Sequence, residues 1–243
     1  AFIWAYHYSQ SNHRGAQGLS GLLLAIAWAK YSLTFPLTLI FINQKNWIPI
    51  TVAAAIHLLL TVVAAAQLGL YPQEFFFSSV AVVLMGSGTG FVNIAAVAML
   101  LHIPTAVAMT AISVALIGSA YLVSRVQNVQ PLTLLSVLAL LSYALFYHHN
   151  YDFIVLIFLA WCIATERLTP TAMISSVALI VISWFGLWFA NELTPWLPTA
   201  TQGLLTAIDG LQVVVFYLAL LLLTNNLRTN TRRERIADGV LAF

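Results

Sequence analysis

The chain has 243 residues, of which 61% are hydrophobic and only 7% are charged. Soluble domains carry roughly 25% charged residues, so this composition excludes an ordinary soluble fold. The net charge of +2, on basic residues that form no stripe, also excludes a nucleic-acid partner. We therefore expect an all-α protein, a polytopic transmembrane helix bundle in contact with membrane lipid.

A bilayer-spanning helix needs about 20 mostly apolar residues. The apolar run at residues 1–8 is interpreted as the end of an earlier span of a longer protein. About seven further spans are predicted, at 18–42, 47–66, 105–123, 132–147, 152–165, 171–190 and 203–224. Pro36 predicts a kink in the first of them, because proline removes a helical N–H donor. Residues 1–225 would form the transmembrane bundle, and residues 226–243 a basic tail.

Residues 67–104 are apolar but are interrupted by Gly69, Pro72, Pro104 and the glycines of 86–90. This pattern predicts an outer excursion with short interfacial or re-entrant helices at 73–85 and 91–102. Aromatic side chains gather near its start, and such residues are typical of the interfacial belt of a membrane protein. They are Tyr71, Phe75, Phe76 and Phe77.

The basic residues predict the orientation. Seven of the nine follow the first, third, fifth and seventh spans: Lys45, Arg125, Arg167, Arg228, Arg232, Arg233 and Arg235. Positive charge favours the cytoplasmic side, so these turns and the C-terminus are predicted to be cytoplasmic, in a plasma membrane of bacterial type. Arg14 falls on the predicted outer side, and Lys30 falls within the first span.

Lys30 is the most informative charge, because a charged side chain at mid-bilayer costs on the order of 3 kcal/mol. Its position, roughly 14 Å into the predicted helix, is too deep for easy snorkelling. Two explanations stay open at this point. Lys30 could bind the phosphate of a lipid-linked substrate in an outer cavity, or it could form a structural ion pair, with Asp209 as the candidate partner.

A second polar cluster lies between the fourth and fifth spans. Histidine can donate to phosphate or move a proton near neutral pH, which makes His148 and His149 candidate substrate-binding residues with Tyr151 and Asp152. An ordinary wet loop with Asp152 as a helix cap is the alternative. Two adjacent histidines point in different directions, and no further ligands stand at a diagnostic spacing, so no metal site is predicted. No cofactor is expected.

Three other residues are weaker candidates for a functional role. Asn93 follows the glycine-rich turn at 86–90, which lacks the Lys-Ser/Thr of a phosphate-binding loop. Amides there could receive an anion, although a flexible turn is favoured. Arg14 could face a phosphate or lie in the headgroup layer. His57, in the middle of an apolar segment, is expected to be packed and hydrogen-bonded within the bundle.

The segment from Gly21 to Leu37, with Lys30 and Pro36, resembles part of the polyprenyl-phosphate-sugar-dependent glycosyltransferases, most closely glycosyltransferase family 87. The basic turn Gln44–Trp47 and the Tyr151–Asp152 pair add to the resemblance. The resemblance implies a GT-C architecture, with this chain as a C-terminal part. It also implies transfer of a sugar, such as mannose, from a polyprenyl-phosphate donor to a glycan or glycolipid acceptor on the outer face. The general base would lie upstream of this sequence.

Two other functions stay open. A transporter would use Lys30, Asp209 and the interrupted 67–104 region near mid-bilayer, where transporters bind their substrates. A scaffolding subunit would use its small residues for close helix contacts, at the alanine runs 53–55 and 64–66.

Overall fold

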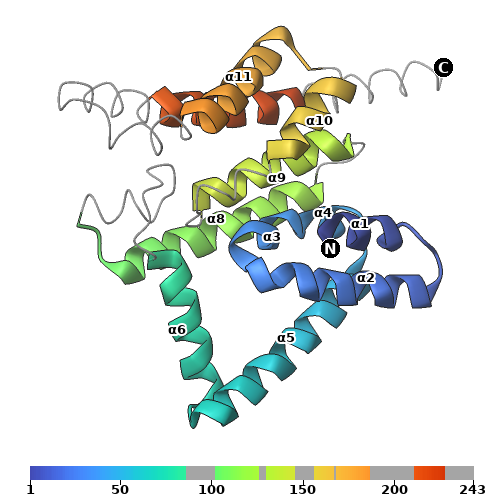
Figure 1. Cartoon of the computed structure of the whole chain (residues 1–243), viewed down its shortest axis with the longest axis vertical. Helices are drawn as coiled ribbons and strands as arrows, with labels where there is room; N and C mark the ends of the chain where they lie inside the picture. The colour runs from blue at the N-terminus through green and yellow to red at the C-terminus, as the bar shows by residue number, and fades with distance from the viewer. Residues whose placement is uncertain (86–101, 126–129, 146–155, 167, 187–210, 228–243) are drawn as a thin grey trace.

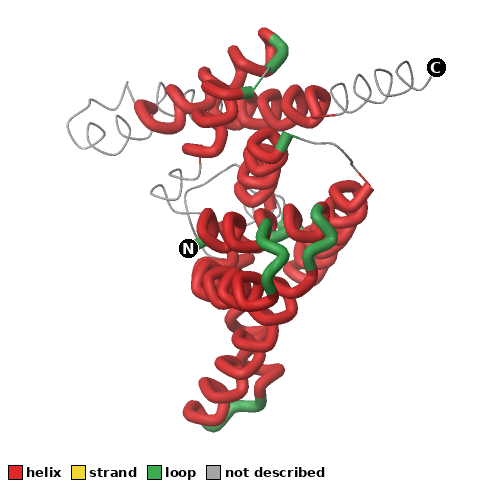
Figure 2. The backbone as a smooth tube through the Cα atoms, turned by 90° about the vertical axis from the view of Figure 1, so that its right-hand side faces the viewer, coloured by secondary structure: helices red, strands yellow, loops and turns green. Residues whose placement is uncertain are grey.

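The computed structural model describes residues 1–85, 102–125, 130–145, 156–166, 168–186 and 211–227. Within these ranges the chain is helical, with short turns between the helices and no strand (Figures 1 and 2). The predicted all-α class is therefore confirmed for this part of the chain. The predicted helix at 91–102 falls outside it, except for His102, which lies in a turn.

The helices of the first half are mostly short. They are α1 (Phe2–Ser9), α2 (Arg14–Ala27), the 3-10 turn η1 (Trp28–Lys30), α3 (Tyr31–Leu37), α4 (Leu39–Asn43), α5 (Trp47–Leu68) and α6 (Pro72–Met85). The second half contains α8 (Thr105–Arg125), α9 (Pro131–Leu145), α10 (Ile157–Thr165), α11 (Pro170–Val181), the π-helical turn η3 (Ile182–Gly186) and a helix at Leu211–Leu227. The predictions for 47–66, 73–85 and 105–123 agree with α5, α6 and α8 to within two residues.

Local signals explain many of these boundaries. Proline occupies the first position of three helices, where its missing N–H has no partner to lose: Pro72, Pro131 and Pro170. Thr169 caps α11, because its hydroxyl accepts a hydrogen bond from the N–H of Ala172. α5 ends at Gly69, whose φ of +67° is readily adopted by glycine alone, and the N–H of Leu70 then donates to the carbonyl of Ala65.

The predicted first span, 18–42, is wrong as a continuous helix. The chain leaves the α-helix after Ala27, passes through η1 and begins α3 at Tyr31. The chain reverses there, so that α3 runs back alongside the body of the molecule (Figure 1). The principal break thus precedes Pro36 by several residues, and a second, smaller break at Thr38 follows it. Neither arm is long enough to cross a bilayer.

Hydrogen bonds bring the predicted basic turns to one end of the bundle. The amide of Asn43, beside Lys45, donates to the carbonyl of Val123 near the end of α8 (2.7 Å). Glu166, which precedes Arg167 in the sequence, accepts from the backbone N–H of Leu132, near the start of α9. The N–H of Thr169 donates to Asn226, at the end of the last described helix (3.2 Å). We call this set of turns the basic end.

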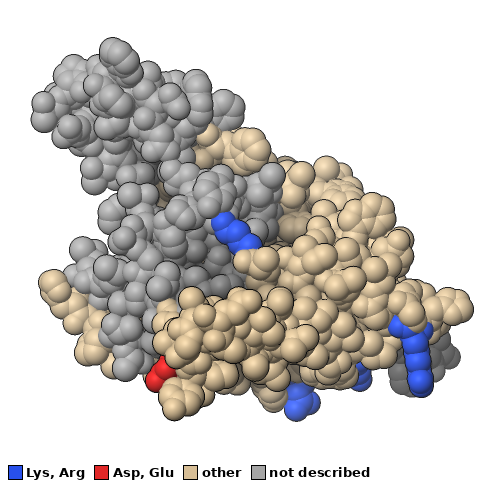
Figure 3. Space-filling model, turned by 60° about the horizontal axis from the view of Figure 1, so that its bottom comes forward, with Lys and Arg blue, Asp and Glu red and all other residues tan. Residues whose placement is uncertain are grey.

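The surface of the described residues has the character of a protein in lipid. Apolar side chains on successive turns face outward, such as Leu58 on α5 (66% exposed), Ile117 on α8 (71%) and Ile174 on α11 (65%). Lys and Arg appear in Figure 3 as isolated points, with one acidic group visible, on a described surface of otherwise uncharged residues. Several polar side chains are buried between helices instead: Ser20, Thr38, Thr133, Ser136, Ser176, Gln212 and Asn226. Polar groups on the inside and apolar groups on the outside are typical of helices packed in a membrane.

By length and composition, one described helix, α5, is long and apolar enough to cross a bilayer. Its 22 residues contain no charge and would extend about 33 Å. The helices Pro131–Leu145 and Leu211–Leu227 are apolar but shorter. A bundle of seven spans therefore stays a prediction.

Candidate functional site

Of the residues predicted to form a site, the structure describes Lys30 and Arg14. Lys30 is half-buried at the end of η1, and Arg14 is exposed at the start of α2. The others, Asn93, His148, His149, Tyr151, Asp152 and Asp209, lie outside the described residues. Whether they converge on Lys30 stays a prediction.

The turn at Lys30 is held by side-chain hydrogen bonds to the backbone. The hydroxyl of Thr34 donates to the carbonyl of Ala27 (2.9 Å) and is also within reach of the Lys30 carbonyl (3.1 Å). A helix that stops leaves its last carbonyls without intrahelical partners, and these bonds supply some of them. A break in a helix within lipid requires such internal partners, because no water is there to replace them.

Trp28 and Thr38 close the turn from the other side. The indole N–H of Trp28 donates to the hydroxyl of Thr38 (2.8 Å), and that hydroxyl donates to the carbonyl of Thr34 (3.0 Å). Trp28, Thr34 and Thr38 are all buried. The two residues of the indole–hydroxyl bond are ten positions apart, which would separate them by about 15 Å in one straight helix. The bond therefore fixes the reversal of the chain.

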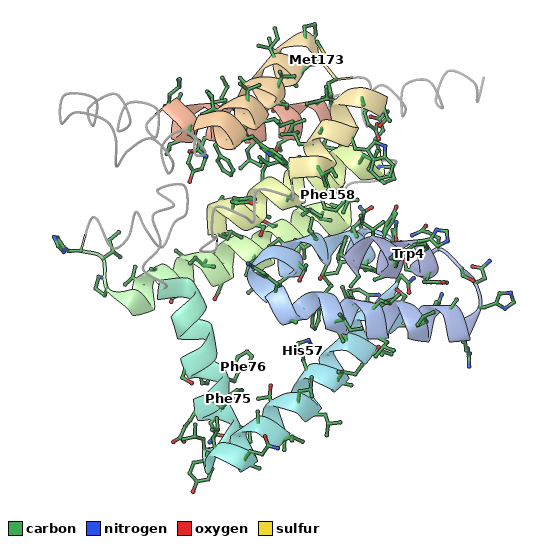
Figure 4. All side chains as sticks on the ribbon, viewed as in Figure 1. Trp4, His57, Phe75, Phe76, Phe158 and Met173 are labelled. Atoms are coloured by element: carbon green, nitrogen blue, oxygen red, sulfur yellow. The ribbon has the colours of Figure 1, made fainter. Side chains whose placement is uncertain are left out.

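His57 ties the turn to α5, on which it lies facing α2 (Figure 4). Its Nε2 is 2.8 Å from the carbonyl of Ala25, so Nε2 carries the proton and donates it. Its ring also lies against Trp28, with centroids 5.6 Å apart. The expectation that His57 is packed and hydrogen-bonded is confirmed. His57 is at the middle of α5, so the Trp28–Lys30 turn lies level with the midpoint of that helix.

The close approach of α2 and α5 depends on Gly21. A Cβ atom placed there would lie 2.5 Å from Cβ and 2.7 Å from Cγ1 of Val52, far inside van der Waals contact. Gly15 and Gly18, on the same helix, have nothing within 4 Å of such an atom. Gly21 thus sets the crossing point of the two helices.

Lys30 occupies the last turn at the C-terminal end of the α2–η1 helix. The carbonyl dipoles at such an end carry partial negative charge, which favours a cation by about 0.3–1 kcal/mol at exposed sites. This interaction reduces the cost of placing the amine at this depth. If the turn lies at mid-bilayer, where a charge costs about 3 kcal/mol, the dipole interaction does not offset that cost by itself, and we expect an anion or polar group near the amine as well.

The two ends of the α2–α4 segment lie at the same level. The amide of Gln10, before α2, donates to Oε1 of Gln44, after α4 (2.9 Å). The amide of Asn46 donates to the carbonyl of Ser9 (2.7 Å). Arg14, predicted on the outer side, follows Gln10 by four residues and therefore lies at the same end of the bundle as Lys45, which corrects the sequence-based topology. The segment is a helical hairpin with Lys30 in its turn, which we call the Lys30 hairpin (residues 14–43).

The sequence carried signals for this hairpin that periodicity does not capture. Amide side chains gather around its two ends, at Gln10, Asn12 and Gln17 and at Asn43, Gln44 and Asn46. Amides at both ends of an apolar run, with hydroxyls at Thr34 and Thr38 inside it, mark a segment whose ends meet. His57 and Thr38 are the contributors to the turn that sequence reasoning had not placed beside Lys30.

Comparisons of the chain with protein-family models, with curated proteins and with solved structures found no match. The site is therefore interpreted from its own residues. Among the described residues, no group of three or more His, Cys, Asp or Glu side chains could hold a metal ion.

Proposed function

We propose that the chain is an integral membrane protein of several spans that acts as a glycosyltransferase of the GT-C class. It would transfer a sugar, such as mannose, from a polyprenyl-phosphate carrier to an acceptor on the outer face. In this proposal Lys30 binds the phosphate of the donor. The observation that carries it is a half-buried lysine in the turn of an apolar helical hairpin, level with the middle of α5.

The membrane placement is supported by the exposed apolar faces of α5, α8, α11 and the helix Leu211–Leu227. A monomeric soluble protein rarely exposes contiguous apolar patches of more than a few hundred Å². With the basic end in the cytoplasm, the Lys30 hairpin enters from the cytoplasmic side, and its turn faces the outer half of the bilayer. The tip of the α5–α6 hairpin, with exposed Tyr71, Phe76 and Phe77, then lies at the outer interface.

A lipid-linked phosphate suits this position for a physical reason. A polyprenyl chain dissolves in the same hydrocarbon that the exposed helix faces require, so the carrier reaches the Lys30 turn sideways from the bilayer. A phosphate that leaves when the glycosidic bond breaks gains from a nearby positive charge, because charge develops on it in the transition state. His148, His149, Tyr151 and Asp152 are proposed to contact the same substrate, and the general base is proposed to lie upstream.

Binding of polyprenyl phosphate to the full chain in nanodiscs tests the proposal. Lys30→Met should weaken binding at least tenfold, since a charge-assisted hydrogen bond contributes about 1.5–3 kcal/mol. Lys30→Arg should retain most of the affinity. Gln67→Met, near the end of α5, replaces an exposed polar side chain that has no proposed binding role; it is the control and should bind as the unchanged protein does. Equal affinity of the Lys30→Met and unchanged proteins would remove Lys30 from the donor site.

A transporter is the second candidate, and one observation favours it. The break in the Lys30 hairpin lies level with the midpoint of α5, and transporters bind substrates at broken helices near mid-bilayer. Proteoliposomes distinguish the two functions. Sugar transfer from a panel of polyprenyl-phosphate sugars without flux of solute supports the transferase, whereas anion flux that depends on Lys30 without transfer supports the transporter.

A further inference from the structure

Lys45 adopts a backbone conformation that normally belongs to glycine. Its φ is +56°, in the left-handed region. The turn after α4 is closed by the N–H of Asn46, which donates to the carbonyl of Phe41 (2.9 Å), and by the N–H of Lys45, which donates to that of Ile42 (3.0 Å). Glycine is the usual residue at the left-handed position of such a helix end, because a Cβ atom there is strained. The turn therefore carries a lysine where a glycine would fold more easily.

Two more basic side chains lie at the same end of the bundle. Arg125 ends α8, which is joined to the Lys45 turn by the bond from Asn43 to the Val123 carbonyl. Arg14 begins α2, four residues after Gln10, whose amide bonds to Gln44 in that turn. Arg14, Lys45 and Arg125 are all exposed.

Exposed aromatic rings accompany these charges. Trp47 follows Lys45 at the start of α5 and is 55% exposed, and the guanidinium of Arg125 lies over the ring of exposed Tyr121, 5.1 Å from its centroid. Tryptophan and tyrosine of this kind lie at the headgroup level of a bilayer. The rings therefore mark the level of the interface at the basic end.

Acidic groups do little to cancel this charge among the described residues. Glu74 lies in the first turn of α6, at the opposite end of α5. Glu166 is at the basic end but half-buried, and burial raises the pKa of its carboxyl, so the carboxylate is less favoured there.

We propose that Arg14, Lys45 and Arg125 form a binding surface for the headgroups of anionic phospholipids in the leaflet at the basic end. Their amine and guanidinium groups would bind headgroup phosphates, while Trp47 and Tyr121 lie among the glycerol and upper acyl groups. A basic residue near an anionic membrane surface contributes binding that corresponds to about a fivefold preference. The proposal rests on the membrane placement, but it does not depend on the enzymatic or transport function.

The experiment uses the full chain in nanodiscs of phosphatidylcholine alone and of phosphatidylcholine with 30% phosphatidylglycerol. The readouts are the midpoint of thermal unfolding and the quenching of tryptophan fluorescence by brominated lipid of each kind. The unchanged protein should prefer the anionic lipid by about a hundredfold, since three fivefold contributions multiply, and 0.5 M salt should weaken that preference. Arg14→Gln, Lys45→Gln and Arg125→Gln should each reduce the preference about fivefold.

Lys45→Gly gives the sharpest test, because it should preserve or raise the thermal stability in phosphatidylcholine while it lowers the stabilisation by phosphatidylglycerol. In phosphatidylcholine alone the midpoint of thermal unfolding of this variant should equal or exceed that of the unchanged protein. The reason is that glycine adopts the left-handed backbone conformation of residue 45 without strain. The gain in midpoint on adding phosphatidylglycerol should shrink, whereas Lys45→Arg should keep that gain. Glu74→Gln, at the opposite end, should change neither.

An anionic preference that is undiminished in a variant carrying all three glutamines would overturn the proposal and assign the effect to the C-terminal arginines. Equal midpoints in both lipids for the unchanged protein would overturn it as well. Failure of the protein to float with vesicles of either composition would instead contradict the membrane placement itself, so the two failures are distinguishable.

Discussion

The side-chain amide of Gln10 donates a hydrogen bond to that of Gln44 at 2.9 Å, although 34 positions separate the two residues. A straight helix over residues 18–42 would hold these two side chains at opposite faces of a membrane. The bond instead requires that the chain returns to the level from which it started. The Lys30 hairpin, the position of Arg14 and the depth of the Lys30 turn all follow from this relationship.

Labelling of single cysteines tests the hairpin directly. Arg14→Cys and Lys45→Cys should react with a membrane-impermeant maleimide from the same side of proteoliposomes, because both residues lie at the basic end. Gln73→Cys, at the tip of the α5–α6 hairpin, should react from the other side. The native Cys162 is buried and gives little background. Labelling of positions 14 and 73 from one side, and of position 45 from the other, would contradict the hairpin and support a single spanning helix over residues 18–42.

Gly21→Ala should destabilise the protein by about 1–3 kcal/mol, because the added methyl group overlaps Val52 and forces α2 away from α5. Gly18→Ala is the matched control on the same helix, where the methyl group meets nothing within 4 Å. It should be neutral or stabilising by up to about 1 kcal/mol, since alanine favours the helix over glycine. Unfolding by denaturant in mixed micelles measures the free energy of unfolding of both variants. Similar effects at the two positions would contradict the close crossing.

The indole–hydroxyl bond between Trp28 and Thr38 should show energetic coupling. Trp28→Phe and Thr38→Val each remove one partner, and the double variant should lose less than the sum of the two, by about 0.5–1.5 kcal/mol. Thr51→Val is the control, because that exposed hydroxyl bonds only to the carbonyl of Ile48 in its own helix. Purely additive losses for Trp28 and Thr38 would show that the turn does not depend on their bond.

The stability of the protein should depend on the protonation of Glu166. Burial raises the pKa of its carboxyl above the ordinary value of 4.5, and the hydrogen bond from the Leu132 N–H partly opposes this. The folded state therefore holds the proton to higher pH than the unfolded state does. The free energy of unfolding should fall as pH rises from about 4.5 through the raised pKa, and then level off. Glu166→Gln should remove this slope, as measured by thermal unfolding between pH 4 and 8, whereas exposed Glu74→Gln should leave it in place.

Much of the fold could be predicted because the apolar runs end at strong local signals. Pro72, Pro131 and Pro170 begin helices, Gly69 ends one, and α5 falls almost where a count of apolar residues places it. The positions of Lys45 and Arg125 at one end also agree with the alternation of basic turns along the sequence. Such features depend on residues close together in the chain.

The reversal at Lys30 could not be predicted in the same way, because hydropathy does not distinguish one long helix from two short antiparallel ones. It depends on contacts from distant residues: Thr38 to Trp28, His57 to the Ala25 carbonyl, and Gln44 to Gln10. The sequence identifies Lys30 only as a charge in an apolar segment, and the structure places this residue in the turn of the hairpin. The pairing of Lys30 with the 148–152 cluster stays a prediction.

The reversal at Trp28–Lys30 also has a consequence for biosynthesis. A continuous span satisfies its own backbone and can partition into lipid as soon as it leaves the ribosome. The Lys30 hairpin takes one of its bonds from His57, which is translated 27 residues after Lys30, and it packs through Gly21 against Val52. We therefore expect residues 14–43 to adopt the hairpin only after α5 has been synthesised, because the contacts from His57 and Val52 are missing until then.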